Sequence, residues 1–387
     1  MEWPPPRRRF QGFLQGGFEA TSLRWWDGRQ LDVIAATRHD AMAAEDYRLL
    51  RGAGLHTARD GLRWHLIERS PGQYDWSSFL PMLRAARDTG MQVVWDLCHY
   101  GTPADLDVWS NAFVDRFAAF AGAAARLAQA EGAGPGLWCP MNEMSFWAWI
   151  GGDRGHMHPG AQGRGDDLKR QLARAAIAAM HAVLAVDPRA CFMHPEPLIH
   201  ITAHPDRPWD RDAVENYRQA QFHAWDMVCG RLHPELGGEP RLLDVVGVNY
   251  YFNNQWVHEF ETMGMGHRLS RPLHDMLAEV HGRYGRPIVI SETGAEGANG
   301  PGWLHYVGGE VRTALRHGIP VEGICIYPVM DYPGWVDSRH CPAGLIRLDD
   351  GYQARSVDRE MALAIEEQAM LLAPLLDAAP LIGIAAE

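Results

Sequence analysis

Several features that define large classes of protein are absent from this 387-residue sequence. It has no Cys-x-x-Cys pair, and its 6 cysteines are far apart and lie mostly within apolar runs. This pattern predicts reduced core thiols in a cytoplasmic protein. No stretch reaches the roughly 20 apolar residues that a membrane-spanning helix needs. The first ten residues are rich in proline and arginine without an apolar core, so we expect neither a secretory signal nor a membrane partner.

Acidic residues also outnumber basic ones: 48 aspartates and glutamates stand against 36 lysines and arginines, so the net charge at pH 7 is −12. A nucleic-acid backbone repels such a protein unless basic residues gather on one face. Only Arg7, Arg8 and Arg9 form a local basic run. We therefore expect no nucleic-acid partner.

Apolar and aromatic residues, by contrast, are plentiful. Of the residues, 47% are hydrophobic and 15 are tryptophan, which is enough for a large core. Short apolar runs alternate with longer segments of helical period, the pattern of repeated βα units. The expected strands are residues 12–18, 56–59, 92–98, 137–141, 190–193, 243–248, 288–291 and 323–327. The expected helices include residues 41–53, 79–89, 112–130, 167–186, 272–284 and 303–317.

Eight strands alternating with helices predict an α/β fold, a (β/α)8 TIM barrel that forms a single domain over residues 12–387 after an N-terminal arm, residues 1–11. No Gly-x-Gly-x-x-Gly follows the first strand, which disfavours a dinucleotide-binding fold. Long polar segments at residues 149–165, 194–211 and 252–271 are predicted to be loops over the C-terminal face of the barrel. Residues 371–384 are apolar but contain Pro374 and Pro380, so we expect a packed final helix and an irregular end.

Two of the expected strands deliver a glutamate at their C-terminal ends. The apolar run beginning at Leu137 leads to Asn142 and Glu143, and the run beginning at Ile288 leads to Glu292. In a parallel barrel both ends open on the same face, so the two carboxylates can meet there. A carboxylate pair is what glycoside hydrolysis requires.

A series of motifs occurs in the order known from one enzyme family. They are Phe13-Leu14-Gln15-Gly16, Ala58-Arg59 with Trp64, Ser70-Pro71-Gly72, His99-Tyr100-Gly101, Asn142-Glu143, Gly247-Val248-Asn249-Tyr250-Tyr251, Ser291-Glu292-Thr293-Gly294 and Tyr327-Pro328. The chain, from about residue 12 to about residue 358, resembles the family 1 glycoside hydrolases of clan A, which are β-glucosidase-type barrels.

The resemblance implies a role for each matching residue. Glu143 would be the general acid/base and Glu292 the nucleophile of a retaining mechanism, with Arg59 and Tyr251 beside the nucleophile. The substrate-binding residues that it implies are Arg59, His99, Asn142, Asn249, Tyr251, Tyr327 and Trp335. Retention would require the carboxyl groups to lie about 5 to 5.5 Å apart, and inversion about 6.5 to 9.5 Å. From the residues themselves, Trp147 and Trp149 could supply an apolar wall that keeps Glu143 protonated.

The sequence departs from the family at the sugar-binding positions. Met144 replaces the proline that follows the Asn-Glu pair, and Leu23 falls where the family has a glutamine; Gln15 or Glu19 could replace that glutamine. Gly334 occupies the position at which the family has a glutamate that binds the outer hydroxyls of glucose. Tyr327 occupies the position of the tryptophan that stacks under the sugar. We therefore expect the protein to catalyse the reaction of this family, whereas the sequence does not identify the sugar that it accepts.

The remaining histidines and aromatic residues suggest further candidates. His156 with His158, and His194 with His200 and His204, have spacings that could chelate zinc, but no His-Glu-x-x-His motif occurs, so we expect no metal and no cofactor. Glu196 and His200 are expected at the mouth, where they could contact a second sugar. The tryptophans expected to stack on sugar faces are Trp149, Trp256 and Trp335.

The sequence thus predicts a retaining β-glycosidase that hydrolyses or transfers a β-linked glycosyl unit of a β-glycoside or oligosaccharide. A catalytically silent sugar-binding barrel and, with less support, a metal-dependent barrel hydrolase are the alternatives. The sugar, the linkage, the aglycone and the oligomeric state stay open.

Overall fold

The protein is a closed barrel of eight parallel strands in a computed structural model that describes residues 9–349 and 351–377. Around the barrel the strands follow the order β1, β14, β13, β11, β9, β8, β7 and β4. Their bounds are β1 Leu14–Gly17, β4 Thr57–Gly61, β7 Gln92–Asp96, β8 Leu137–Cys139, β9 Cys191–Pro197, β11 Val245–Asn249, β13 Ile288–Thr293 and β14 Val321–Ile326. These are the eight predicted strands, and the predicted (β/α)8 barrel is confirmed.

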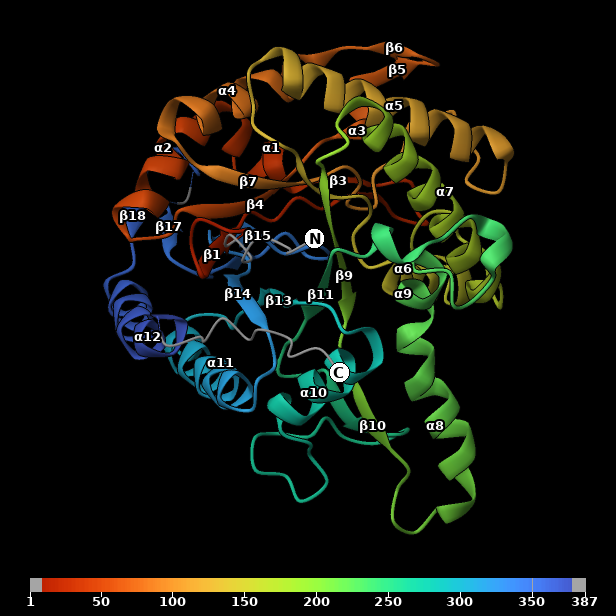
Figure 1. Cartoon of the computed structure of the whole chain (residues 1–387), viewed down its shortest axis with the longest axis vertical. Helices are drawn as coiled ribbons and strands as arrows, with labels where there is room; N and C mark the ends of the chain where they lie inside the picture. The colour runs from red at the N-terminus through yellow and green to blue at the C-terminus, as the bar shows by residue number, and fades with distance from the viewer. Residues whose placement is uncertain (1–8, 350, 378–387) are drawn as a thin grey trace, which may run out of the picture.

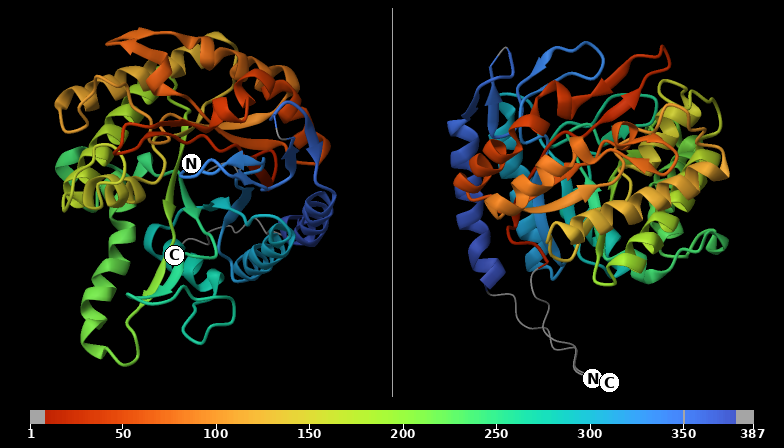
Figure 2. Two further views of the ribbon diagram at one scale, coloured as in Figure 1. Left: turned by 180° about the vertical axis from the view of Figure 1, so that it is seen from behind. Right: turned by 90° about the horizontal axis from the view of Figure 1, so that it is seen from above.

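Helices cover the outside of the barrel, because each helix after a strand packs its apolar face back onto the sheet (Figure 1). They are α2 His39–Gly52, α4 Leu80–Thr89, α5 Asn111–Ala130, α7 Gly165–Val186, α10 Leu273–Tyr284, α11 Asn299–Arg316 and α12 Arg359–Asp377. Helix α12 lies beside α11 along one side of the molecule (Figure 2). Gly90, with φ of 70°, ends α4 in the left-handed conformation that glycine adopts without strain.

Short elements lie in the connections between the barrel strands and the larger helices. Five two-stranded sheets pair β2 Ser22–Arg24 with β3 Gln30–Asp32, β5 Glu68–Ser70 with β6 Gln73–Tyr74, β10 His200–Thr202 with β12 Gln255–Val257, β15 Tyr332–Pro333 with β16 His340–Cys341, and β17 Ile346–Leu348 with β18 Arg355–Val357. The short helices are α1 Val33–Ala36, α3 Trp64–Ile67, α6 Met144–Trp147, α8 Arg211–Gln219 and α9 His223–Val228.

The segments predicted to be loops are more ordered than expected. Strand β9 continues to Pro197, and β10 and β12 pair in parallel, so parts of residues 194–211 and 252–271 are strand. Residues Ala148–Asp153 form a π-helix. Helix α8, which extends away from the barrel with β10 (Figure 1), is short and polar and was not predicted. The final helix also starts earlier than predicted and contains Pro374, while residues 378–384 lie outside the described residues.

The N-terminal end of the barrel is closed by apolar side chains. Phe10 packs there against residues from five strands: Val94, Cys139, Met193, Val245 and Val289. Residues 1–8 of the expected N-terminal arm lie outside the described residues. Of the remainder, Arg9 forms an ion pair of 2.7 Å with Glu322 at this end.

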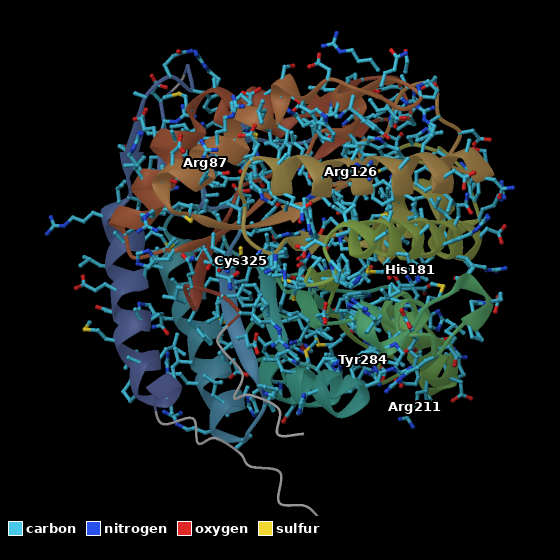
Figure 3. All side chains as sticks on the ribbon, turned by 45° about the horizontal axis from the view of Figure 1, so that its top comes forward. Arg87, Arg126, His181, Arg211, Tyr284 and Cys325 are labelled. Carbon is cyan, nitrogen blue, oxygen red and sulfur yellow. The ribbon has the colours of Figure 1, made fainter. Side chains whose placement is uncertain are left out.

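The cysteines are free thiols, and Cys325 lies inside the molecule, whereas Arg211 lies at its margin (Figure 3). Within the described part of the chain, every helix is too short or too polar to cross a membrane.

Candidate active site

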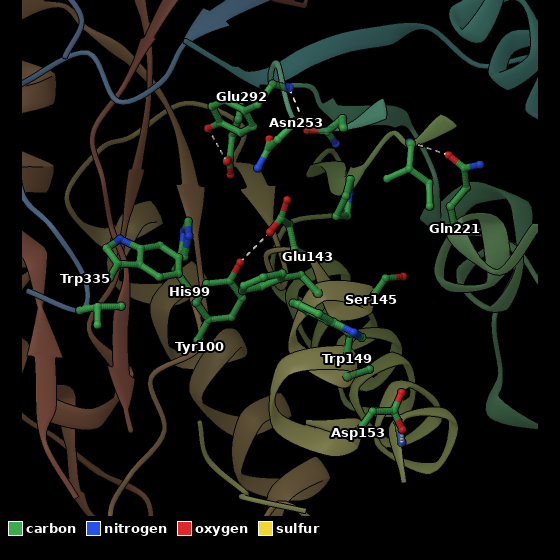
Figure 4. Close-up of a pocket in the computed structure, with 18 of the residues that line it drawn as sticks. His99, Tyr100, Glu143, Ser145, Trp149, Asp153, Gln221, Asn253, Glu292 and Trp335 are labelled. Carbon is green, nitrogen blue, oxygen red and sulfur yellow. Dashed lines mark hydrogen bonds between the residues drawn. The ribbon is translucent and has the colours of Figure 1, made fainter. Parts of the chain in front are cut away.

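A cavity of about 980 Å³ opens at the C-terminal ends of the barrel strands (Figure 4). Glu143 and Glu292 both line it, although 149 positions separate them in the chain. Other predicted residues on its wall are Glu19, His99, Trp149, Tyr251, Trp256 and Trp335. The strand ends therefore bring the two glutamates to one site, as a parallel barrel requires.

Glu143 follows β8 in a turn with φ of 40°, an uncommon conformation for a residue with a side chain. Its backbone N–H donates to the carbonyl of Pro195 over 3.0 Å, which ties the turn to β9. Two side chains donate to its carboxyl group: Tyr100 to Oε2 over 2.8 Å and Asn249 to Oε1 over 2.9 Å. Burial and the charge of Glu292 raise the pKa of Glu143 to about 8.

Glu292 lies on β13 and is 5% exposed. Arg59 donates from Nη1 to its Oε1 over 2.7 Å, and the Tyr251 hydroxyl donates to its Oε2 over 2.9 Å. Burial raises the pKa of Glu292 as well, but the Arg59 guanidinium opposes this rise. Because no described residue brings such a cation to Glu143, a proton shared between the two carboxyl groups resides on Glu143.

Arg59, on β4, is held by a second buried acid that the sequence did not single out. Its Nε and Nη2 donate to the two carboxylate oxygens of Asp96 over 2.9 and 2.8 Å. Burial alone would raise the pKa of Asp96, but Arg59 and His99 hold it below its usual value. The guanidinium is therefore fixed in a plane between Asp96 and Glu292.

Asn142 and His99 complete this layer of polar side chains. Asn142 Oδ1 accepts from Arg59 Nη2 over 2.6 Å, and its Nδ2 lies 2.9 Å from both His99 Nε2 and the Tyr100 hydroxyl. His99 Nδ1 lies 3.0 Å from Asp96 Oδ2. The predicted residues Arg59, His99, Asn142, Asn249 and Tyr251 thus belong to one hydrogen-bonded group around the two glutamates.

Glu19, and not Gln15, reaches the cavity from the first strand region. Glu19 Oε1 accepts from the Thr21 N–H over 3.0 Å and from the Tyr327 hydroxyl over 3.4 Å. Gln15 is buried within the barrel and donates to the Gly12 carbonyl over 3.4 Å. Tyr327 is buried, with its ring centre 5.3 Å from Arg59 Cζ.

Solved structures resemble this chain, whereas no protein-family model and no curated protein matches its sequence. The AHE enzyme from Alicyclobacillus herbarius superposes with a TM-score of 0.77 at 18% identity, covering 96% of this chain and 100% of that one. A β-glucosidase from Thermotoga maritima in complex with glucoimidazole gives a TM-score of 0.75 at 15% identity, covering 94% and 98%. The family 1 β-glucosidase from the same organism in complex with isofagomine lactam gives 0.73 at 16%, covering 92% and 98%. The chain has the fold of the family 1 β-glucosidases.

Within this β-glucosidase fold, two predicted mouth residues lie elsewhere. Glu196 points out of the barrel towards the helix layer, because side chains alternate along β9, and its Oε2 accepts from the Ser145 N–H over 3.0 Å. His200 Nε2 lies 3.1 Å from the Leu269 carbonyl, and neither residue lines the cavity. The expectation that they contact a second sugar is therefore wrong for both.

The candidate zinc histidines do not form a ligand set. His158 Nδ1 accepts from Arg24 over 2.8 Å, and His194 Nε2 lies 3.0 Å from the Leu242 carbonyl. Among the described residues, no group of three or more His, Cys, Asp or Glu side chains could hold a metal ion.

The far end of the cavity in this β-glucosidase fold contains residues that sequence reasoning missed. They include Asp153, Lys169, Tyr217 and Gln221, which come from the segments around α7 and α8. Lys169 is nearly buried and donates to the Ala220 carbonyl over 3.2 Å. No motif marks these residues, because they come from separate segments: Asp153 ends the π-helix, Lys169 is on α7, Tyr217 is on α8 and Gln221 follows α8. Trp149 and Trp256, by contrast, were predicted and do line the cavity.

Proposed function

We propose that the protein is a retaining β-glycosidase that acts on a β-glycoside or oligosaccharide through a covalent intermediate on Glu292. The observation that carries this proposal is the unequal surroundings of two carboxyl groups in one cavity. Arg59 and Tyr251 donate to Glu292, which favours its ionised form, whereas Glu143 receives hydrogen bonds from uncharged side chains of the described part of the chain and has a pKa of about 8. One group is thus suited to attack and the other to hold a proton.

In the first step, a carboxylate oxygen of Glu292 attacks the anomeric carbon, and the bond from that carbon to the leaving oxygen breaks. Glu143 donates its proton to the leaving oxygen, so the alcohol departs neutral. Glu292 is now an ester and has lost its charge. Burial still raises the pKa of Glu143, but the added repulsion from Glu292 is lost with that charge, which favours the ionised form of Glu143.

In the second step, Glu143 accepts a proton from water, and the water oxygen attacks the anomeric carbon. The ester bond to Glu292 breaks, and its electron pair returns to the carboxylate. Two inversions at the same carbon give net retention. A sugar hydroxyl in place of water gives transfer, which is part of the proposal.

The wall of the cavity supports a sugar substrate. Trp149, Trp256 and Trp335 offer aromatic faces on which the C–H surface of a pyranose packs. Glu19 and His99 offer polar atoms beside Glu292 where a glycosyl unit would sit. The solved T. maritima β-glucosidase structures contain glucoimidazole and isofagomine lactam in complex, which supports a sugar-like ligand.

The test is turnover of a panel of nitrophenyl α- and β-glycosides, with the first-formed anomer read by proton NMR. A β-glycoside that is hydrolysed with the β-anomer appearing first supports the proposal. The α-anomer appearing first would show inversion. Binding of the glycosides without turnover by any of them would favour the silent sugar-binding barrel.

A further inference from the structure

A line of hydrogen bonds connects the surroundings of Glu292 to Glu143. It runs from Arg59 Nη2 to Asn142 Oδ1 over 2.6 Å, from Asn142 Nδ2 to the Tyr100 hydroxyl over 2.9 Å, and from that hydroxyl to Glu143 Oε2 over 2.8 Å. Arg59 also donates to Glu292, so one guanidinium is linked to both glutamates: directly to Glu292, and through Asn142 and Tyr100 to Glu143. Tyr100 was not assigned a role by the sequence.

The direction of each bond follows from Arg59. A guanidinium can only donate, so the atom of Asn142 that faces Arg59 must be the oxygen. The amide nitrogen of Asn142 must then face Tyr100, whose oxygen accepts from it. The hydroxyl proton of Tyr100 is left to point at Glu143.

The same reasoning settles the tautomer of His99. Asn142 Nδ2 also points at His99 Nε2, which must accept, so the ring proton lies on Nδ1 and faces Asp96. His99 is thus tied to the same buried acid that holds Arg59.

The other oxygen of Glu143 is occupied too. Asn249 donates to Oε1 over 2.9 Å, and its own oxygen accepts from the Ser291 hydroxyl over 2.7 Å. Both carboxyl oxygens therefore receive hydrogen bonds from the protein. While Asn249 and Tyr100 both donate to Glu143, a proton that it carries faces the cavity, where a glycosidic oxygen would lie.

We propose that Tyr100 is a positioning residue, which holds the Glu143 carboxyl group through a hydrogen bond whose direction Arg59 sets by way of Asn142. The inference rests on the proposed function, since it assigns Tyr100 to the acid/base of that reaction. The bond favours the carboxylate form of Glu143, which makes the protonated group a stronger acid and keeps its proton turned towards the substrate.

Tyr100 is well placed to keep this geometry. It is 3% exposed and its backbone has φ of 72°. Its ring packs edge-on against His99 at 4.9 Å and Trp147 at 6.0 Å between ring centres. Burial and the charge of Glu143 raise the pKa of Tyr100 well above its usual value, so the hydroxyl keeps its proton throughout the working pH range.

Several titratable groups besides Tyr100 interact electrostatically with Glu143. They are Glu292 on β13, Glu196 on β9 and Tyr251 after β11. Glu292 and Glu196 oppose ionisation of Glu143, whereas Tyr100 and Asn249 favour it. Removal of the Tyr100 hydroxyl therefore shifts the balance towards protonated Glu143.

The first test follows the carboxyl carbon of Glu143 by NMR in protein labelled with carboxyl-¹³C glutamate, and needs no turnover. Glu143→Gln assigns the signal. We expect its titration midpoint to move to higher pH in Tyr100→Phe and to lower pH when 3-fluorotyrosine, a stronger donor, replaces Tyr100. Tyr74→Phe, in β6 outside the cavity, is the matched control and should leave the midpoint unchanged. An unchanged midpoint in a folded Tyr100→Phe or in the fluorotyrosine protein overturns the inference.

The second test measures kcat/KM for aryl β-glycosides of the sugar selected by the nitrophenyl panel. If Glu143 is a weaker acid in Tyr100→Phe, the rate should fall most for substrates whose leaving group must be protonated as it departs. We expect Tyr100→Phe to lower kcat/KM by about 10-fold for a phenyl glycoside and to change it little for a dinitrophenyl glycoside. Equal losses for both substrates would mark a merely structural role and overturn the inference. Absence of turnover by the wild type would instead refute the proposed function, and the NMR titration would still decide the role of Tyr100.

Discussion

At the scale of single residues, the two glutamates differ because Arg59 contacts only one of them. Its three nitrogens donate to Asp96, Glu292 and Asn142, and the side chain is 1% exposed. The strand-end pattern was enough to predict both glutamates, and the family motifs led to Arg59. The parts played by Asp96 and Tyr100 were not predicted, because they depend on which side chains the barrel register brings together.

Replacing each glutamate should produce a different defect. We expect Glu292→Ala to abolish turnover of aryl β-glycosides, because no carboxylate remains to attack. We expect Glu143→Ala to lower turnover by about 10² to 10⁴-fold for poor leaving groups. For an aryl glycoside with a good leaving group, added azide should speed turnover of Glu143→Ala and give a β-glycosyl azide, because azide attacks the ester on Glu292 without needing a general base; in Glu292→Ala, a single attack by azide would give the α-glycosyl azide instead. Wild-type rates in Glu292→Ala, or no azide product with Glu143→Ala, would count against these roles.

Replacing Arg59 should affect both stability and the pH profile. In Arg59→Met, Asp96 and Glu292 lose their buried cation, and we expect the free energy of unfolding to fall by about 3 to 5 kcal/mol. The pKa of Glu292 should rise, so the acidic limb of kcat/KM should move to higher pH. Urea unfolding and a pH profile measure the two effects. Arg84→Met, which removes an exposed pair with Glu131, should change neither.

At the scale of elements, α2 is joined to β4 by a buried histidine between two acids. His39 Nδ1 lies 2.8 Å from Asp46 Oδ2, and Nε2 lies 2.7 Å from Asp60 Oδ2. Burial alone would lower the pKa of His39, but Asp60 and Asp46 outweigh it and raise the pKa to about 9. His39 is therefore charged at neutral pH and supports the strand that carries Arg59.

The charge of His39 should make stability depend on pH. Its pKa is higher in the folded protein than the 6.5 usual for histidine, so its contribution is fully present below about pH 6.5 and is lost as pH rises through about 9. The difference corresponds to about 3 kcal/mol. Urea unfolding between pH 6 and 10 should show this loss in the wild type. A pH dependence of the same size in His39→Gln would contradict the assignment.

Elements were predicted well where their pattern was apolar and poorly where it was polar. The barrel strands and six helices were found because their buried faces repeat with a clear period. Helix α8 was missed because nearly all its side chains are polar, with Val214 its buried residue. Strands β10 and β12 were missed because each has three residues, too few for an alternating pattern.

At the scale of the whole molecule, the candidate active site and the apolar cluster around Phe10 lie at opposite ends of the barrel. The cavity occupies the C-terminal end, whereas Phe10 and five strand residues close the opposite end. In barrels of this kind the catalytic loops gather at one end, and residues at the other end contribute to stability. The alternation of strands and helices predicted this arrangement. The role of Phe10 in closing the N-terminal end was not predicted, because the sequence analysis placed Phe10 in the N-terminal arm.

Phe10→Ala tests this separation. The variant leaves a void among Val94, Met193 and Val289, so we expect the free energy of unfolding to fall by about 3 to 5 kcal/mol. The kcat/KM of the folded protein should stay at the wild-type value. Thermal unfolding and activity at a temperature where the variant is folded measure both. A large loss of kcat/KM with little loss of stability would show that the two ends are not independent.

The measurement that tests the central claim most directly is trapping of the nucleophile with a 2-deoxy-2-fluoro-β-glycosyl fluoride of the sugar that the panel selects. The fluorine at position 2 slows both steps, but the fluoride leaving group lets the first proceed, so the ester accumulates. We predict a mass increase of one fluoroglycosyl unit, located by peptide mapping on Glu292 and absent from Glu292→Ala. An adduct on another residue, or a wild-type enzyme that hydrolyses the β-glycoside without ever gaining this mass, would contradict the account.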